Sequence, residues 1–212
     1  MKNMYKGPGF VLLVLIVVAA GIMVLPVSSI AAQSKTLDNL MTAYNGESNA
    51  HAKYLAYAKK ADQEGYGKVA SLFRAAATAE EIHLKNHARV IETMGGTPKA
   101  DIKLPEIKST KENLEDAVKG ENYERTTMYV EFIAQAEKEK NADAVLTFTY
   151  AKDAEAEHAK LYQEALNNLD QWKAPKTDFY VCPTCGYTVE GKPSFTSCPV
   201  CATPTSLYKV VI

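Results

Sequence analysis

The chain has 212 residues, 47% of them hydrophobic, which is enough for one or two domains with a substantial core. Its formal net charge is −1, and its basic residues form no stripe with interleaved aromatic residues. Nucleic acid is therefore not an expected partner, and function has to be inferred from the placement of particular residues.

Residues 1–32 are predicted to be a signal peptide or a membrane anchor. Two lysines precede an apolar run of 16 residues, 10–25, and Ser29-Ile30-Ala31 resembles a signal-peptidase site. A membrane span needs about 20 residues, which the run reaches only if it continues to Ala32. A cleaved signal and an anchor through residues 10–32 both remain open. Either one predicts export to the periplasm or another extracytoplasmic compartment.

Residues 33–172 are predicted to be a helical domain, rich in Ala, Glu, Lys and Leu. Ser109 and Glu112 form a capping-box pattern at the start of the third helix. Both prolines of the domain fall in one long connection, residues 97–109. Four long helices with one long middle connection predict a mainly α fold, the ferritin-like four-helix bundle. The expected helices span about residues 36–64, 68–94, 109–140 and 142–169.

The helical domain contains an internal repeat. Gly46-Glu47 recurs as Gly120-Glu121, offset by 74 residues. Six further residues recur at an offset of 75. These pairs are Tyr54 and Tyr129, Glu64 and Glu139, Phe73 and Phe148, Glu80 and Glu155, His83 and His158, and Lys85 and Lys160. A duplicated helix pair predicts a centre with near two-fold symmetry, which suits two metal ions.

Two Glu-x-x-His pairs, one in each repeat, are the strongest metal signal in the helices. Residues three apart on a helix project from nearly the same face. Together with glutamates on the first and third helices they make the ligand set of a di-iron carboxylate site. The candidate ligands are Glu47, Glu80, His83, Glu121, Glu124, Glu155 and His158.

Two further pairs of residues in these helices need an interpretation. Gly46 and Gly120 interrupt helical segments, and a close approach of helices beside the ligands would explain them. His51 and His87 lie near the ligand face, but neither has a histidine partner in the repeat. We expect both histidines beside the metal or at the surface, not bound to it.

A short linker, residues 173–176, leads to a second module, residues 177–212, with strand-like pieces at 179–181 and 207–212. All four cysteines lie here in two Cys-x-x-Cys pairs, a spacing that predicts a tetrahedral iron or zinc site. Two disulfides are the alternative. The neighbouring di-iron site favours iron. The cysteines are Cys182, Cys185, Cys198 and Cys201.

From residue 36 to 212, the order and separation of these motifs resemble rubrerythrin, a di-iron bundle followed by a rubredoxin-like four-cysteine iron module. The resemblance implies an oxidoreductase of oxidative-stress defence. It would reduce hydrogen peroxide to water, with electron transport from an unidentified donor through the four-cysteine iron. It also suggests a homodimer.

The resemblance implies a role for each ligand. Glu80 and Glu155 would bridge the irons. On reduction, the first iron would exchange Glu124 for His83. Tyr54 and Tyr129 match tyrosines that hydrogen-bond near the family's centre, and with His83 they are the candidate catalytic residues. The remaining ligands would be Glu47 on the first iron, and Glu121 and His158 on the second.

Two other functions remain open at this point. A ferritin-like iron oxidase or iron-binding protein would use the bundle but not the four-cysteine module. A non-enzymatic zinc-ribbon binding protein would use the module but not the seven ligand-type residues of the bundle. Metal analysis separates these cases, since about three irons per chain fit the peroxidase and zinc alone fits the binding protein.

Overall fold

The computed structural model describes Met1 and residues 34–212. The predicted signal or anchor segment lies outside the described residues. Among the helices from residue 34 onward, none is long and apolar enough to cross a bilayer.

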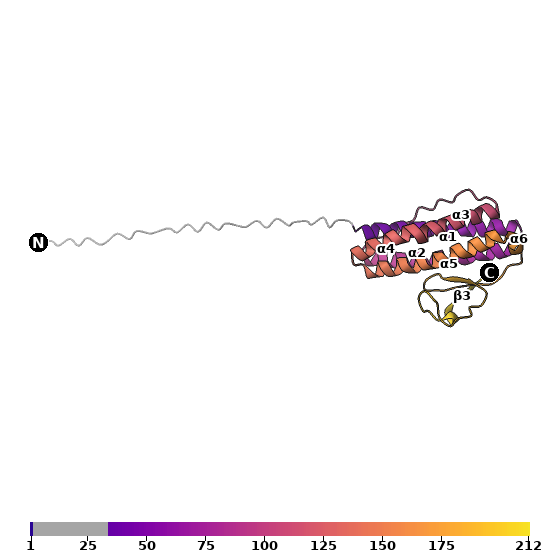
Figure 1. The fold of residues 1–212 in the computed structure, drawn as a ribbon. Helices are drawn as coiled ribbons and strands as arrows, with labels where there is room; N and C mark the ends of the chain where they lie inside the picture. Colours follow the sequence, from indigo (N-terminus) through magenta and orange to yellow (C-terminus); the bar gives the residue numbers. More distant parts are fainter. Residues whose placement is uncertain (2–33) are drawn as a thin grey trace. The chain divides into compact units, whose positions relative to one another are not determined.

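The described helices form the predicted bundle, with the small sheet beside it, so the predicted fold class is confirmed (Figure 1). The long connection between the second and third helices follows the outside of the bundle. Two asparagines of the first helix hold it there. The side-chain oxygens of Asn45 and Asn49 accept hydrogen bonds from the backbone N–H groups of Asp101 and Lys103 at 2.8 and 2.7 Å. The helices are α1 (Lys35–Gln63), α2 (Gly67–Thr93), α3 (Thr110–Tyr123), the π-helix η1 (Glu124–Met128), α4 (Tyr129–Lys138), α5 (Ala142–Asn167) and the short α6 (Leu169–Trp172).

The predicted third helix is not continuous, because η1 interrupts it. A π-helix closes its hydrogen bonds over one residue more than an α-helix does. The repeat offset rises from 74 at Glu121 to 75 at Tyr129, and η1 lies between these two residues. The π-helix therefore accommodates the one extra residue of the second repeat, and the ligand face continues in register beyond it.

Equivalent glutamates of the two repeats cap the first helix of the opposite repeat. Glu64 accepts hydrogen bonds from the backbone N–H and hydroxyl of Thr110 at 2.8 and 2.6 Å, at the start of α3. Glu139 accepts one from the Ser34 hydroxyl at 2.5 Å, at the start of α1. The capping box predicted at Ser109 is also present. Each repeat thus closes the N-terminal end of the other.

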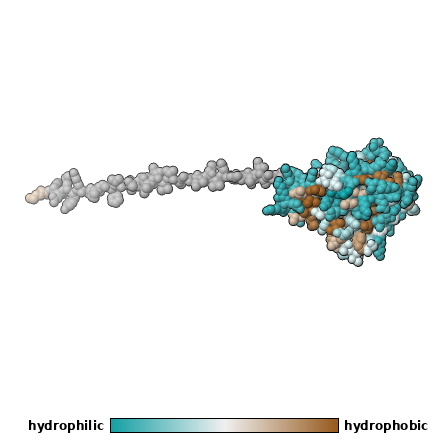
Figure 2. Space-filling model, viewed as in Figure 1, coloured by the Kyte–Doolittle hydropathy of each residue, from teal (hydrophilic) through white to brown (hydrophobic). Residues whose placement is uncertain are grey.

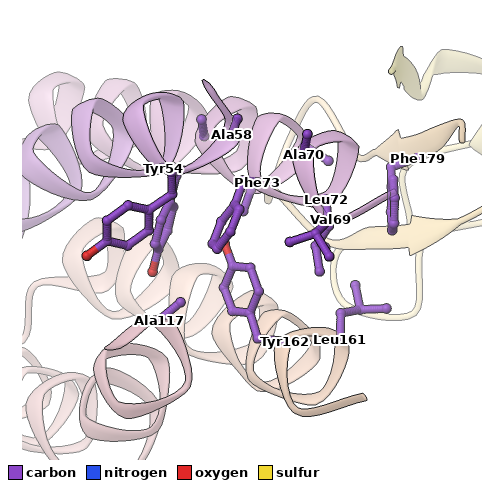
Figure 3. Close-up of a cluster of buried hydrophobic side chains, with 14 of the residues drawn as sticks. Tyr54, Ala58, Val69, Ala70, Leu72, Phe73, Ala117, Leu161, Tyr162 and Phe179 are labelled. Carbon is purple, nitrogen blue, oxygen red and sulfur yellow. The ribbon is translucent and has the colours of Figure 1, made fainter. Parts of the chain in front are cut away.

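The hydrophobic core lies in two clusters between the helices. One surrounds Tyr54, Phe73 and Tyr162, whose rings pack with centroids 5.3 to 6.0 Å apart (Figure 3). The other surrounds Tyr129 and Phe148. Many of the remaining core positions are alanines, which let the helices approach closely. The buried tyrosines bring their hydroxyl groups into the interior of the bundle.

The C-terminal module is a three-stranded antiparallel sheet in the order β2-β1-β3. β1 (Phe179–Val181) and β3 (Lys209–Val211) fall in the two predicted strand-like pieces, whereas β2 (Thr188–Glu190) was not predicted. The module packs on α2, where Lys68 forms an ion pair with Glu190 at 2.8 Å.

The interpretation of Gly46 and Gly120 is wrong. A Cβ added at Gly46 would meet no described atom within 4 Å, and one at Gly120 would meet only the Lys53 side chain, at 3.8 Å. Neither glycine is needed for a close approach of helices. The structure shows no other reason for them.

Candidate metal centres

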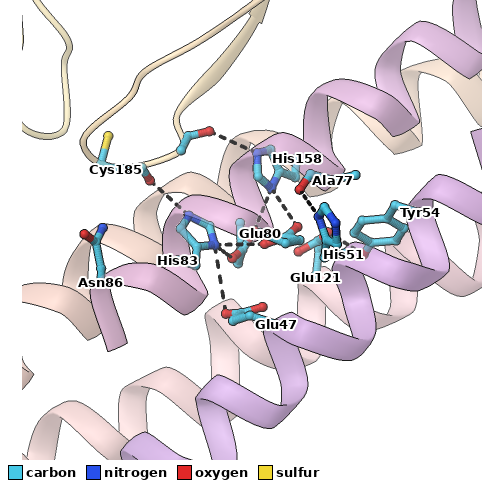
Figure 4. A network of polar contacts seen from close by, with 12 residues as sticks. Glu47, His51, Tyr54, Ala77, Glu80, His83, Asn86, Glu121, His158 and Cys185 are labelled. Atoms are coloured by element: carbon cyan, nitrogen blue, oxygen red, sulfur yellow. Dashed lines mark hydrogen bonds and ion pairs between the residues drawn. The ribbon is translucent and has the colours of Figure 1, made fainter. Parts of the chain in front are cut away.

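Six of the seven predicted bundle ligands meet in the interior of the helices (Figure 4). Each is at most 1% exposed. They come from four different helices, so the folded bundle is required to bring them together. The residues are Glu47 on α1, Glu80 and His83 on α2, Glu121 on α3, and Glu155 and His158 on α5.

These residues form two overlapping groups, in each of which the ligand atoms lie within 4.8 Å of one another. Glu80 and Glu155 belong to both groups. Glu47 and His83 complete the first group. The second group is completed by Glu121 and His158. Two metal positions that share two carboxylates are the arrangement expected of a bridged pair.

Both histidines present the same nitrogen to the cluster. His83 Nδ1 lies 2.8 Å from Glu80 Oε2, and His158 Nδ1 lies 2.6 Å from Glu155 Oε2. Their Nε2 atoms face backbone carbonyls, which can only accept hydrogen bonds. His83 Nε2 is 3.0 Å from the Cys185 oxygen. His158 Nε2 is 3.3 Å from the Gly186 oxygen and 3.1 Å from the Thr188 hydroxyl, which itself donates to Gly186 and therefore accepts here. With the proton held on Nε2, each Nδ1 would present a lone pair to a bound metal.

The carboxylates also fit metal binding. Within residues 34–212, one oxygen each of Glu47, Glu80, Glu121 and Glu155 is buried without a hydrogen-bond partner. Burial, followed by repulsion from neighbouring carboxylates, raises the pKa of Glu47 and Glu121 well above its usual value. Leaving several buried carboxylates unpaired is costly, and bound cations would satisfy them.

Glu124, the seventh predicted ligand, lies outside both groups. It is half-buried at the start of η1, one turn beyond Glu121. Burial and the nearby Glu155 and Glu80 carboxylates raise its pKa to about 8. The structure therefore has His83 at the first position and Glu124 beside it.

Each of the two predicted tyrosines forms a hydrogen bond with a glutamate of the other repeat. Tyr54 donates a hydrogen bond to Glu121 at 2.6 Å, and Tyr129 donates one to Glu47. Burial, then the charge of that same glutamate, raises the pKa of each phenol well above its usual value. Each tyrosine thus stays protonated beside a ligand carboxylate from the other repeat.

Two neighbours of these tyrosines were not identified as site residues from the sequence. His87 is fully buried with Nε2 3.1 Å from the Tyr129 oxygen, and burial lowers its pKa to about 3. Tyr162 packs against Tyr54. The internal repeat could have identified both residues, because positions 87 and 162 are equivalent and lie 75 residues apart. Both His51 and His87 were expected beside the metal or at the surface. His87 lies beside the cluster, and His51 is half-buried with Nδ1 2.7 Å from the Ala77 oxygen.

The four cysteines form the second candidate centre. Their sulfur atoms all lie within 4.8 Å of one another, and all four are free thiols. Cys182 and Cys201 are 3.5 Å apart at sulfur, as are Cys185 and Cys198. A hydrogen bond from Cys185 and backbone N–H groups lower the pKa of Cys182 to about 4. The group is arranged for a tetrahedral metal, and the disulfide alternative is not seen.

The comparisons with known proteins agree with this geometry. A family model described as rubrerythrin matches residues 38–166. The chain belongs to the rubrerythrin family. It is 43% identical to nigerythrin from Nitratidesulfovibrio vulgaris, over 84% of this chain and 87% of nigerythrin. It is 34% identical to rubrerythrin-2 of Clostridium acetobutylicum, over 78% of this chain and 91% of that protein.

Solved structures support the same assignment. Fully reduced, all-ferrous nigerythrin superposes with a TM-score of 0.77 at 39% identity, covering 85% of this chain and 91% of that one. A Desulfovibrio desulfuricans bacterioferritin superposes with a TM-score of 0.59 at 20% identity, covering 65% of this chain and 81% of that one, which shows the fold alone. Rubrerythrins and nigerythrin carry a di-iron site in the bundle and one iron on four cysteines, and both clusters are present here.

The prediction of export is wrong. The matching relatives are nigerythrin and rubrerythrins, which are cytoplasmic proteins. The prediction depended on residues 1–32, which lie outside the part of the chain that the structure describes apart from Met1.

Proposed function

We propose that this member of a family of oxidative-stress oxidoreductases is a peroxidase that reduces hydrogen peroxide to water. The observation that carries the proposal is the pair of buried phenols, Tyr54 and Tyr129, each donating a hydrogen bond to a carboxylate of the metal cluster. When bound, the two irons supply the electrons that break the oxygen–oxygen bond. The protein has to hold the irons, direct protons to the oxygen atoms and deliver further electrons.

The ligand roles follow the two overlapping groups. Glu80 and Glu155, which belong to both groups, would bridge the metals. Glu47 and His83 would complete the first position, and Glu121 and His158 the second. Glu124 would be the spare carboxylate, alternating with His83 at the first position. Its place beside the group, in a π-helix, supports this role, since π-helical turns are frequent at functional sites.

The phenols are the proton donors of the proposed reaction. Because the pKa of each is raised, Tyr54 and Tyr129 keep their protons at neutral pH. They approach the cluster from opposite repeats, so a two-oxygen substrate between the metals would meet one donor from each side. Each hydroxyl has a single proton, so it would turn from its carboxylate partner to a substrate oxygen when peroxide binds, while burial keeps the ring in place.

The four-cysteine module would deliver electrons to the bundle. The Cys185 backbone oxygen accepts a hydrogen bond from His83 Nε2 at 3.0 Å, so one contact joins a cysteine of the module to a ligand of the bundle. Gly186 makes this approach possible, since a Cβ there would lie 2.4 Å from His83 Nε2. The external donor would be a reduced protein or small carrier that docks near the module.

A homodimer remains part of the proposal. The surface in Figure 2 is mostly hydrophilic but carries separate hydrophobic patches. Large apolar side chains that are about half exposed include Leu55, Val130 and Leu146. Such side chains can contribute to an interface between copies of the chain.

The test compares two oxidants. Iron-loaded, fully reduced protein is mixed anaerobically with peroxide, or with dioxygen in a parallel sample, and its absorption is followed with time. A peroxidase is oxidised much faster by peroxide, whereas a ferritin-like iron oxidase is oxidised faster by dioxygen. If the protein as purified contains zinc in both centres and reacts with neither oxidant, the non-enzymatic binding protein is supported instead. Cys185→Ser should remove the ferric-thiolate absorption and slow re-reduction, but leave a single turnover with peroxide intact.

A further inference from the structure

Tyr129 has a histidine as its second polar partner. Its hydroxyl donates to Glu47, and His87 Nε2 lies 3.1 Å from the same oxygen. The other ring nitrogen, Nδ1, lies 3.0 Å from the Thr147 hydroxyl. His87 and Tyr129 are 0% exposed and Thr147 is 3% exposed. The four side chains form one buried chain that ends on a carboxylate of the metal cluster.

The direction of every hydrogen bond in this chain is fixed by the metal-bound state. A metal-binding carboxylate is deprotonated, so Glu47 can only accept. Tyr129 has one proton, which it gives to Glu47, and its oxygen can then only accept from His87. The proton of a neutral imidazole must therefore be on Nε2, and the bare Nδ1 accepts from the Thr147 hydroxyl.

The internal repeat provides a comparison at the second metal position. Residue 162, the equivalent of residue 87, is a buried tyrosine whose hydroxyl lies near that of Tyr54. Residue 72, the equivalent of residue 147, is a buried leucine. Tyr54 still donates to Glu121 there. The fold therefore packs well without a histidine and a threonine at these positions, so their presence beside Tyr129 needs another reason.

We propose that His87 is a positioning residue for the first metal position. Carrying its proton on Nε2, it holds the Tyr129 hydroxyl in the orientation that donates to Glu47, and through Tyr129 it fixes that carboxylate for metal binding. The inference depends on the proposed role of Glu47 as a ligand, but not on the reaction that the metals perform. Outer partners of this kind change metal affinity by about 10–100-fold when they are removed.

Metal titration of the full chain tests the predicted effect of His87 on metal affinity. His87→Phe keeps a ring of similar size but no donor, whereas His87→Gln places an amide N–H near the position of Nε2. We expect His87→Phe to weaken ferrous-iron binding at one of the two bundle positions by about 10–100-fold, and His87→Gln to restore most of it. Glu81→Ala, at a half-exposed position on the same helix, should leave both affinities unchanged. In a Tyr129→Phe background, His87→Phe should have little further effect.

The proton position is tested without any substitution. In ¹⁵N-histidine-labelled, zinc-loaded protein, His87 should have its proton on Nε2, and its Nδ1 should have the chemical shift of a bare nitrogen. A proton on Nδ1 would overturn the proposal. So would wild-type metal affinity in His87→Phe, or equal losses in His87→Phe and His87→Gln, which would show a packing role only. If Glu47→Ala also left the metal affinity unchanged, the ligand assignment would be at fault.

Discussion

At the scale of single residues, the two shared carboxylates should have the largest effect on metal binding. Glu80 and Glu155 belong to both metal groups and are at most 1% exposed. Replacing either one by alanine should lower iron occupancy at both positions, since each position loses a ligand. The helices should remain formed, because alanine favours the helix. Iron analysis with circular dichroism checks this, and Glu81→Ala, at the half-exposed neighbouring position, is the matched control.

His83 and His158 should respond differently to replacement by alanine. In the proposed scheme, Glu124 would replace His83 at the first position, whereas His158 has no such substitute among the proposed ligands. We predict that His83→Ala keeps two irons in the bundle but reduces peroxide at least about 100-fold more slowly, the scale of a lost positioned group. His158→Ala should lose one iron. Equal metal loss in both variants would show that His83 is a permanent ligand without a substitute.

Most of the ligand set could be predicted from the sequence because its residues recur at fixed spacing on helices. Glu80, His83, Glu155 and His158 lie three apart in matched pairs, and the bundle brings them together as expected. His87 was harder to interpret. Its partner in the repeat is a tyrosine, and its role depends on Thr147, which is 60 residues away in the chain. Spacing along one helix does not reveal such a contact.

At the scale of elements, the glutamates that cap the opposite repeat should make stability depend on pH. Hydrogen bonds from Thr110 lower the pKa of Glu64 to about 2. A carboxyl group with a lowered pKa in the folded state stabilises the protein above its unfolded pKa of 4.5. That contribution is lost as the pH falls from there toward 2.

Glu64→Gln keeps an acceptor oxygen for Thr110 but removes the charge, so it should destabilise the protein at pH 7 by up to about 1 kcal/mol after allowing for solvent screening. The difference from the wild type should shrink steadily below pH 4.5. Denaturant unfolding of both proteins over this range measures it, with the exposed Glu131→Gln as control. A difference that stays constant with pH would mean that the charge of Glu64 does not contribute.

The helices illustrate what sequence periodicity can and cannot predict. The ends of α1, α2 and α5 were predicted to within two residues, because glycines, caps and apolar spacing mark them. The interruption of the third helix by η1 was not predicted, although its signal was present in the change of offset from 74 to 75. A π-helix and an α-helix use the same residue types, so composition does not separate them.

At the scale of the whole molecule, the contact between the module and the bundle determines whether the two centres act together. Gly186 has a φ of +78°, and its lack of a Cβ lets the cysteine loop reach His83. Gly186→Ala should push the loop away from His83 Nε2, because a Cβ there would lie only 2.4 Å from that atom. Both centres should still bind iron, but electron transfer between them should slow. Stopped-flow absorption of the two centres after a single addition of peroxide measures that rate. An unchanged rate would mean that electrons do not pass through this contact.

Peroxide titration of the fully reduced, iron-loaded protein under anaerobic conditions is the most direct test of the whole account. Metal analysis should first give about three irons per chain, two for the bundle and one for the four cysteines. Reduction of peroxide to water takes two electrons, so one equivalent should oxidise the di-iron pair of the Cys185→Ser variant without evolving dioxygen. The wild type should consume half an equivalent more, because its four-cysteine iron gives up one further electron. Equal consumption by the two proteins, or dioxygen release, would contradict a peroxidase supplied with electrons through the cysteine module.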